Sequence, residues 1–182
     1  MRVVGGRLRS RPIAGPKGEG LRPTADRLRE SLFNILAHGY GNPVEGARVL
    51  DLFAGTGALG IEALSRGASY VLFFDDGVEA RSLLRNNTEA LGLGGTSRIF
   101  RRDATKLGPA HPIEPFTLCF LDPPYGKGLA EKALASARDG GWLTKNALVV
   151  VEEAVSAKFV APEGFEEIER RDYDDSELIF LR

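Results

Sequence analysis

Hydrophobic positions change their spacing several times along this 182-residue chain. Short apolar runs rich in β-branched and aromatic residues predict buried strands. Between them, apolar residues three or four positions apart predict amphipathic helices. The expected strands are 48–53, 70–75, 98–102, 116–121, 148–151, 165–173 and 178–181, and the expected helices are 24–37, 58–66, 78–91 and 129–138.

The first of these helices has recognisable ends. Thr24 follows a proline and is a suitable N-cap, and Gly39 is a suitable stop. The apolar face would be formed by Leu28, Leu32, Ile35 and Leu36, with Arg27, Arg29 and Glu30 elsewhere on the helical wheel.

Strands that alternate with helices predict an α/β fold. Each crossover joins two parallel strands in a right-handed sense, so helices cover both faces of the sheet. The last two strands flank Asp174-Asp175-Ser176 and are expected to form an antiparallel hairpin. We therefore expect a doubly wound, mainly parallel sheet.

Composition narrows the class of protein. The longest apolar runs, Tyr70–Phe74 and Ala147–Val151, are far shorter than the roughly 20 residues of a membrane span. The N-terminus has no apolar signal region. A single cysteine, Cys119, and two histidines make disulfides and a structural zinc site unexpected. We expect a cytoplasmic protein without a metal.

Charge is distributed unevenly, although the formal net charge is only −1. Residues 1–30 carry eight basic and three acidic side chains, whereas residues 160–182 carry eight acidic and three basic ones. We expect a basic arm over residues 1–20 and a main domain over residues 21–182. Such an arm indicates a polyanionic partner, although a solvated tail that pairs loosely with the acidic end would explain the same charges.

Within the arm, Gly5-Gly6 is suited to turn a hairpin. Arg7, Arg9 and Arg11 follow at every second position. If this segment is extended, their guanidinium groups share one face, which suits contacts to RNA phosphates.

A glycine-rich turn follows the first strand of the predicted sheet. Gly55-Thr56-Gly57-Ala58-Leu59-Gly60 matches G-x-G-x-x-G, and Asp75 follows Gly55 by 20 positions. This pattern is typical of a dinucleotide site, in which the acid binds a ribose. A tight strand-to-helix turn without a ligand would show the same glycines.

Two more acids shift the expected ligand from a dinucleotide to S-adenosylmethionine. Asp51 lies four residues before Gly55, where a carboxylate suits an ammonium group better than a pyrophosphate. Asp103 follows the third strand. With strand order 3-2-1-4-5, three strand ends line one crevice, so Asp51, Asp75 and Asp103 can bind an amine, a ribose and an adenine amino group. Asp76 is an alternative to Asp75.

Asp122-Pro123-Pro124-Tyr125 follows the fourth strand. Two prolines end a central strand, which is the simplest explanation of the motif. The same turn also holds a carboxylate, carbonyl groups and an aromatic ring beside the expected cleft. These groups suit methyl transfer to the exocyclic amine of a base. The carboxylate and a carbonyl group can accept hydrogen bonds from the amine, and the aromatic ring can stack on the base. Cys119, within the strand, is interpreted as a core residue.

Four segments together resemble the bacterial 16S rRNA guanine-N2 methyltransferase family. They are V-V-G-G-R-L-R-S-R at the N-terminus, L-R-P-T-A-D-R-L-R-E-S-L-F-N at 21–34, D-L-F-A-G-T-G-A-L-G-I-E-A-L-S-R-G-A at 51–68, and D-P-P-Y at 122–125. The segment 21–34 is the most specific, because many methyltransferases share the last two.

This resemblance implies a seven-stranded, Rossmann-like class I methyltransferase fold with strand order 3-2-1-4-5-7-6. It implies transfer of a methyl group from S-adenosylmethionine to N2 of a guanine in 16S rRNA, at position 966 of that RNA. The implied substrate is an assembling small ribosomal subunit rather than bare RNA, and we expect the enzyme to act as a monomer.

The resemblance also implies residue roles. Asp51 and the Gly55/Gly57 turn would bind the methionine part of the cofactor, and Asp75, where relatives usually have Glu, its ribose. Asp103 would contact the adenine. The other cofactor-binding candidates are Phe53, Thr56 and Ala104, the catalytic candidates are Asp122, Pro123, Pro124 and Tyr125, and the RNA-binding candidates are Arg7, Arg9, Arg11, Arg22 and Arg27.

Two alternatives remain open from the residues. Amino methylation of adenine in DNA, or of a protein glutamine, uses a similar proline motif, usually with Asn first. An NAD-dependent oxidoreductase or a nucleotide-binding module would explain the glycine turn. It would leave Asp51 and the motif at 122–125 without a role.

Overall fold

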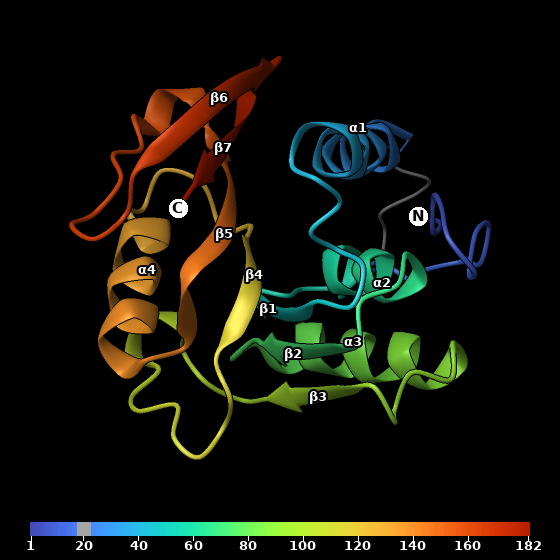
Figure 1. The fold of residues 1–182 in the computed structure, drawn as a ribbon. Helices are drawn as coiled ribbons and strands as arrows, with labels where there is room; N and C mark the ends of the chain where they lie inside the picture. The colour runs from blue at the N-terminus through green and yellow to red at the C-terminus, as the bar shows by residue number, and fades with distance from the viewer. Residues whose placement is uncertain (18–22) are drawn as a thin grey trace.

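The computed structural model describes residues 1–17 and 23–182, which fold around one central sheet (Figure 1). The strands are β1 (Arg48–Leu52), β2 (Tyr70–Phe74), β3 (Ser97–Phe100), β4 (Phe116–Leu121), β5 (Leu143–Ala154), β6 (Glu167–Tyr173) and β7 (Ser176–Leu181). The helices are α1 (Pro23–Gly39), α2 (Ala58–Ser65), α3 (Val78–Ala90) and α4 (Leu129–Gly140), with short 3-10 turns η1 (Ala104–Lys106) and η2 (Val155–Ala157).

The strands pair in the order β3-β2-β1-β4-β5-β7-β6. The pairs from β3 to β5 are parallel, whereas β7 runs antiparallel to both β5 and β6. This order confirms the expected doubly wound class I methyltransferase sheet. It places the carboxyl ends of β1 and β4 side by side, where their connections leave toward opposite faces and ligands bind in such folds.

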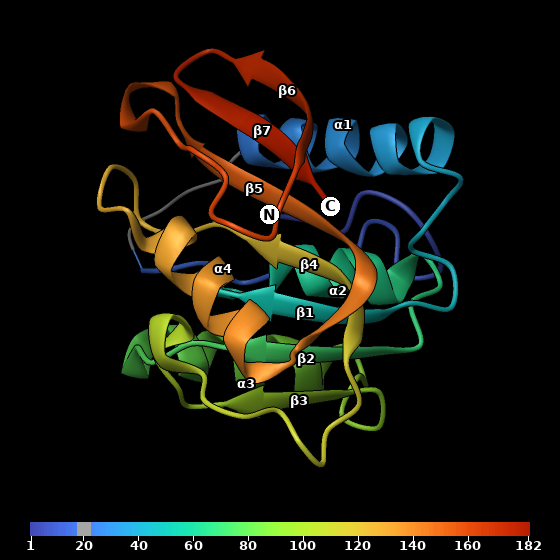
Figure 2. The same cartoon turned by 60° about the vertical axis from the view of Figure 1, so that its left-hand side comes forward.

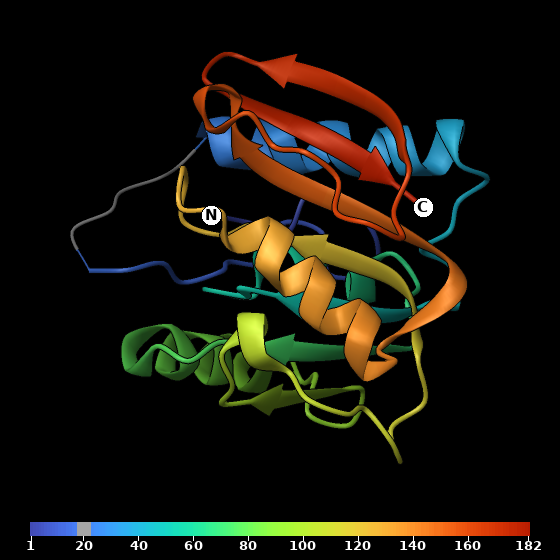
Figure 3. The same cartoon turned by 90° about the vertical axis from the view of Figure 1, so that its left-hand side faces the viewer.

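Helices cover both faces of the sheet (Figures 2 and 3). The side chains of β1 alternate between two buried cores: Val49 packs with residues of α1, α2 and α3, and Leu50 and Leu52 pack with α4 and η1. Because parallel strands are buried on both sides, they read as continuous apolar runs. Within the described part of the chain, no helix combines the length and the apolar character needed to span a bilayer.

The ends of several elements differ from the sequence predictions. β5 reaches Ala154, beyond the apolar run 148–151, because residues from Glu152 onward continue to pair with β7. β1 ends at Leu52, since Phe53 has a φ of 58°. β3 ends at Phe100 rather than 102, and α1 begins at Pro23, before the expected cap.

The N-terminal segment folds back on itself beside α2 (Figure 1). Val3 N–H donates to the Arg11 carbonyl at 2.9 Å, and Ile13 N–H donates to the Met1 carbonyl at 2.8 Å. Residues 7–10 form turns rather than an extended strand, so the condition under which Arg7, Arg9 and Arg11 would share one face of a strand is not met.

Residues 7–10 form turns because the side chain of Leu8 is buried. This side chain enters the core, and its N–H donates to Ser65 Oγ at 2.9 Å. Gly6 supplies the positive φ of 77° that the turn requires. The side chains of Arg7, Arg9 and Arg11 nevertheless remain exposed.

A buried ion-pair network joins the N-terminal segment, α1 and α2. Glu62 is fully buried, and its carboxylate accepts Arg29 Nε at 3.0 Å and Arg66 Nε at 2.8 Å. The same carboxylate accepts the N–H groups of Val4 at 2.9 Å and Gly5 at 2.8 Å. Arg29, which the helical wheel placed away from the apolar face, is therefore buried because Glu62 and the N-terminal segment cover it.

Candidate active site

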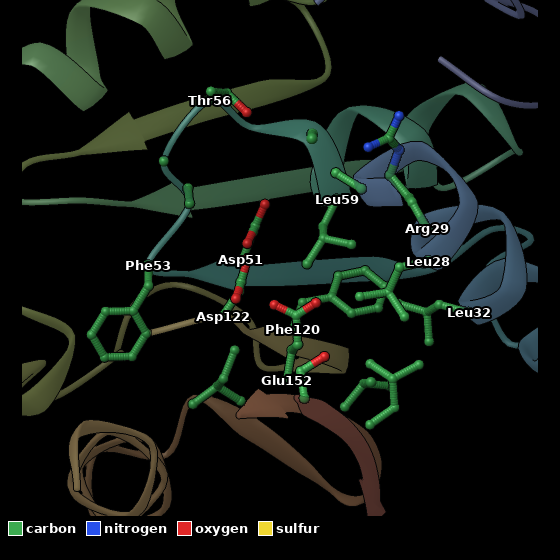
Figure 4. A pocket seen from close by; sticks show the side chains of 18 of the residues that line it. Leu28, Arg29, Leu32, Asp51, Phe53, Thr56, Leu59, Phe120, Asp122 and Glu152 are labelled. Atoms are coloured by element: carbon green, nitrogen blue, oxygen red, sulfur yellow. The ribbon is translucent and has the colours of Figure 1, made fainter. Parts of the chain in front are cut away.

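Two adjoining cavities open at the carboxyl ends of the central strands. The larger has a volume of about 650 Å³ and is lined by residues of α1, β1, β4 and β5 and of the glycine turn. The smaller, about 210 Å³, lies at the ends of β2 and β3. Phe53 lines both cavities. Figure 4 shows Asp51, Asp122 and Glu152 around the larger one.

The glycine turn is held close to the sheet. Gly57, the N-cap of α2, has a φ of 85°, and a Cβ there would lie 2.4 Å from Leu84 Cδ1. A Cβ on Gly60 would lie 2.4 Å from the ring of Phe73. Both glycines therefore let α2 pack against β2 and α3, while Gly55 and Thr56 face the larger cavity.

Asp51 is buried at the base of the larger cavity, with 1% of its surface exposed. Burial raises its pKa to about 8, and the Asp75 carboxylate adds to this, although a hydrogen bond from Gly60 N–H at 3.0 Å opposes it. A buried acid that lacks a counter-charge is well suited to receive a cation. Its position therefore fits the ammonium group expected from the sequence.

Asp75 ties two loops together at the end of β2. Its two carboxylate oxygens accept the N–H groups of Gly55 and Gly77, each at 2.9 Å. The exposed Asp76 lines the same smaller cavity. Each oxygen of Asp75 keeps a lone pair for another donor, so both acids of this cavity can accept hydrogen bonds from a ligand.

Asp103 caps the η1 turn at the end of β3. Its Oδ1 accepts Thr105 N–H at 2.9 Å and Thr105 Oγ1–H at 2.7 Å, and these bonds lower the pKa of the Asp103 carboxyl. Asp103 and the buried Ala104 line the smaller cavity beside Phe53. The structure thus brings the acids at the carboxyl ends of β1, β2 and β3 to one edge of the sheet, divided between two cavities.

The Asp-Pro-Pro-Tyr turn follows β4 and separates its residues between the cavities. Asp122 and Tyr125 line the larger cavity and Pro124 lines the smaller, whereas Pro123 is buried. The Tyr125 hydroxyl donates to Glu152 Oε2 at 3.2 Å. Burial and the carboxylates of Glu152 and Asp122 raise the pKa of Tyr125 to about 12, so the phenol stays neutral at physiological pH.

Glu152 and Arg29 are residues of the site that the sequence pattern did not predict. Glu152 comes directly after the apolar run of β5, and Arg29 was placed on the polar side of its helix; both line the larger cavity. One signal was available for Glu152. Extending the strand beyond Val151 places Glu152 beside Asp122, because β4 and β5 are parallel neighbours.

Of the proposed RNA-binding arginines, the four that the structure describes line neither cavity. Arg7, Arg9 and Arg11 are exposed on the N-terminal segment, and Arg27 is exposed on α1. Arg22 lies outside the described residues. Met1 and Pro16, at the two ends of the N-terminal segment, line the larger cavity, so the basic segment borders the mouth of the site.

A sheet of this order with a glycine turn after β1 defines a class I methyltransferase, as the sequence predicts. The solved structure of the Escherichia coli protein yhhF superposes with a TM-score of 0.82 at 30% identity, covering 100% of this chain and 96% of that one. The chain belongs to the conserved hypothetical protein 95 family, whose model matches residues 1–182.

Similar curated proteins carry the name ribosomal RNA small subunit methyltransferase D. The protein from Escherichia coli K12 is 39% identical over 156 residues, which cover 85% of this chain and 75% of the relative. The one from Haemophilus influenzae is 34% identical over 167 residues, covering 91% and 84%. The chain is therefore a methyltransferase, which confirms the expected class of enzyme.

Proposed function

We propose that this protein transfers a methyl group from S-adenosylmethionine to the exocyclic N2 amine of a guanine in small-subunit ribosomal RNA. The observation that carries the proposal is one cavity that is lined by Asp51, Asp122 and Tyr125 together. Asp51, which would bind the cation of the cofactor, therefore lies close to Asp122 and Tyr125, which would bind the amine of the substrate. The names of the relatives support ribosomal RNA as the substrate.

The residues present fit the proposed cofactor. Asp51 would bind the ammonium group, with Phe53, Gly55 and Thr56 beside it in the larger cavity. In the smaller cavity Asp75 or Asp76 would bind the ribose, and Asp103 and Ala104 the adenine. When bound, S-adenosylmethionine supplies an electrophilic methyl group on its sulfonium.

The Asp122–Tyr125 turn would prepare the amine for attack. An exocyclic amine is a weak nucleophile because its lone pair is delocalised into the ring. The Asp122 carboxylate and a carbonyl of the proline turn would accept its two N–H bonds and stabilise the positive charge that develops on nitrogen. The neutral Tyr125 ring would stack on the base and fix its plane. Holding both reactants in line lowers the barrier further.

The proposed substrate sets where the enzyme acts. We propose that it works as a cytoplasmic monomer on the small ribosomal subunit or an assembly intermediate. The target guanine would be unpaired or extruded from its helix, since extrusion costs only a few kcal/mol. The exposed basic segment beside the cavity would bind the surrounding phosphates.

Asp122→Ala tests the proposed chemistry. Purified protein and labelled S-adenosylmethionine should yield N2-methylguanosine in small-subunit particles from a strain that lacks this gene. The variant should lower turnover by roughly 100- to 1,000-fold, as expected for loss of a group that stabilises transition-state charge. Calorimetric binding of S-adenosylhomocysteine should change little. Glu114→Gln, an exposed residue before β4, serves as the control.

Other outcomes would contradict the proposal. Near-normal turnover of Asp122→Ala would remove the role of that carboxylate. Nucleoside and amino-acid analysis that found methylated adenine or glutamine would favour the other amino methyltransferases. Calorimetry that showed NAD bound more tightly than S-adenosylhomocysteine would reject the cofactor.

A further inference from the structure

We propose that Glu152 accepts the N1–H of the target guanine and so makes the site select guanine over adenine. This inference rests on the proposed function, because it concerns the base that receives the methyl group. It gives a role to a carboxylate of the larger cavity that the chemistry above does not use.

Strand register places Glu152 next to Asp122. Leu121 of β4 pairs with Val151 of β5, and both side chains pack on the α4 side of the sheet. Because side chains alternate along a strand, the next residues, Asp122 and Glu152, face the opposite side, toward the larger cavity. Neighbouring strands lie roughly 4.8 Å apart, so the two carboxyl groups extend from adjacent positions into one space (Figure 4).

The neighbouring contacts distinguish Glu152 from Glu153. Glu152 accepts a hydrogen bond from the Tyr125 hydroxyl, whose ring is proposed to stack on the base. Glu153 is buried and accepts the N–H groups of Gly126 at 3.1 Å and Ala154 at 2.9 Å. Glu153 therefore supports the turn from behind, whereas Glu152 faces the cavity.

Two adjacent carboxylates match the Watson–Crick edge of guanine. That edge presents the N2 amine and the N1–H side by side, both as donors. Adenine presents its N6 amine beside an N1 lone pair, which would face the Glu152 carboxylate without a proton between them. A site that is built to accept a hydrogen bond rejects a base that lacks the donor, because the acceptor group of the protein is then left unpaired.

A base with an N2 amine but no N1–H isolates this contact. Small-subunit particles would be reconstituted with rRNA that carries either guanine or 2,6-diaminopurine at the mapped target. Both bases offer the N2 amine, but 2,6-diaminopurine has an N1 acceptor. Wild-type protein should prefer guanine in kcat/KM by roughly 10- to 100-fold, the range that one unmade buried hydrogen bond gives.

Glu152→Gln should reduce this preference at least about tenfold, because the Gln amide can donate to the N1 acceptor. Glu152→Ala should bring the two bases toward equal rates. Glu114→Gln should keep the wild-type ratio. Thermal unfolding of each variant checks that it is folded.

The alternative is that Glu152 only orients Tyr125. In that case Glu152→Gln would lower kcat/KM equally for guanine and 2,6-diaminopurine, and the ratio of the two values would stay as in wild type. This result would overturn the inference but would leave the proposed N2-methylation of guanine intact. Equal kcat/KM values of wild-type protein for guanine and 2,6-diaminopurine would overturn the inference as well. If wild-type protein methylated neither base at N2, the proposed function itself would be wrong, and the inference would fall with it.

Discussion

Asp51 shows how a single residue sets the electrostatics of the site. Its carboxyl group is buried where β1 meets the glycine turn and accepts one backbone N–H from Gly60. One hydrogen bond does not replace the solvation of a charged carboxylate. The folded protein therefore holds this group in its neutral form until a cation enters the larger cavity.

The pH dependence of stability tests this interpretation. The pKa of Asp51 rises from 3.8 to about 8 on folding. Between these values the unfolded chain releases a proton that the ligand-free folded protein keeps, so the group lowers stability as pH rises from about 4 to about 8. Asp51→Asn removes this effect. Its stability relative to wild type should therefore increase as pH rises from 4 to 8, by at most about 1.4 kcal/mol for each pH unit, measured by urea unfolding.

The same variant should bind S-adenosylhomocysteine more weakly at pH 8, because the ammonium group loses its counter-charge. Asp76→Asn, at an exposed carboxyl, should leave the pH dependence of stability unchanged. Parallel stability curves for wild type and Asp51→Asn would contradict the buried-acid interpretation.

At the scale of elements, Glu62 holds the N-terminal segment, α1 and α2 in place. It lies on α2 and contacts Arg29 of α1 and the backbone of Val4 and Gly5. Arg29 also pairs with Asp26 at 2.9 Å and donates to the Arg2 carbonyl. Since Arg29 lines the larger cavity, this network fixes one wall of the site.

Glu62→Gln should destabilise the protein by roughly 3 kcal/mol, because it removes the buried counter-charge of Arg29 and leaves only the partly exposed Asp26 to pair with it. The N-terminal segment should also be cleaved faster by trypsin, as its backbone loses charged acceptors. Urea unfolding and limited proteolysis measure the two effects. The control variant Glu30→Gln, at an exposed residue of α1, should change neither the stability nor the rate of cleavage. If Glu62→Gln lowered the free energy of unfolding by less than about 0.5 kcal/mol, the network would be dispensable.

Prediction of individual elements succeeded where burial alone decides the structure. The apolar runs of β1, β2 and β4 lie in the centre of the sheet, so their patterns match their pairing. The end of β5 was predicted too early because Glu152 and Glu153 are held by pairing with β7, which the local sequence does not show. The turns at 7–10 were missed for a similar reason, since Leu8 packs against distant elements.

For the whole molecule, the position of the basic segment matters more than the net charge. Its exposed arginines lie on a segment whose ends, Met1 and Pro16, border the larger cavity. Arg7 N–H donates to the Ser65 carbonyl at 2.9 Å, which anchors the segment to α2. An RNA whose target base enters the cavity would therefore pass close to these charges.

Replacing Arg7, Arg9 and Arg11 together by alanine should flatten the salt dependence of RNA binding. Each lost phosphate contact should reduce the slope of log K against log salt by roughly 0.7–0.9. Filter binding to small-subunit RNA across a salt series measures it. A matched variant that replaces the exposed lysines Lys106, Lys145 and Lys158 should keep the wild-type slope. An unchanged slope in the arginine variant would mean that the segment is only a solvated surface.

The sequence by itself determined the alternation of strands and helices, the glycine turn and the acids at the ends of successive strands, because these depend on local spacing and on which side chains avoid water. Tertiary structure alone decided that Arg29 is buried against Glu62, that the carboxyl group of Asp51 is buried with a raised pKa, and that Glu152 stands beside Asp122. These features arise from contacts between segments far apart in the chain, and their energies depend on burial that no local pattern encodes.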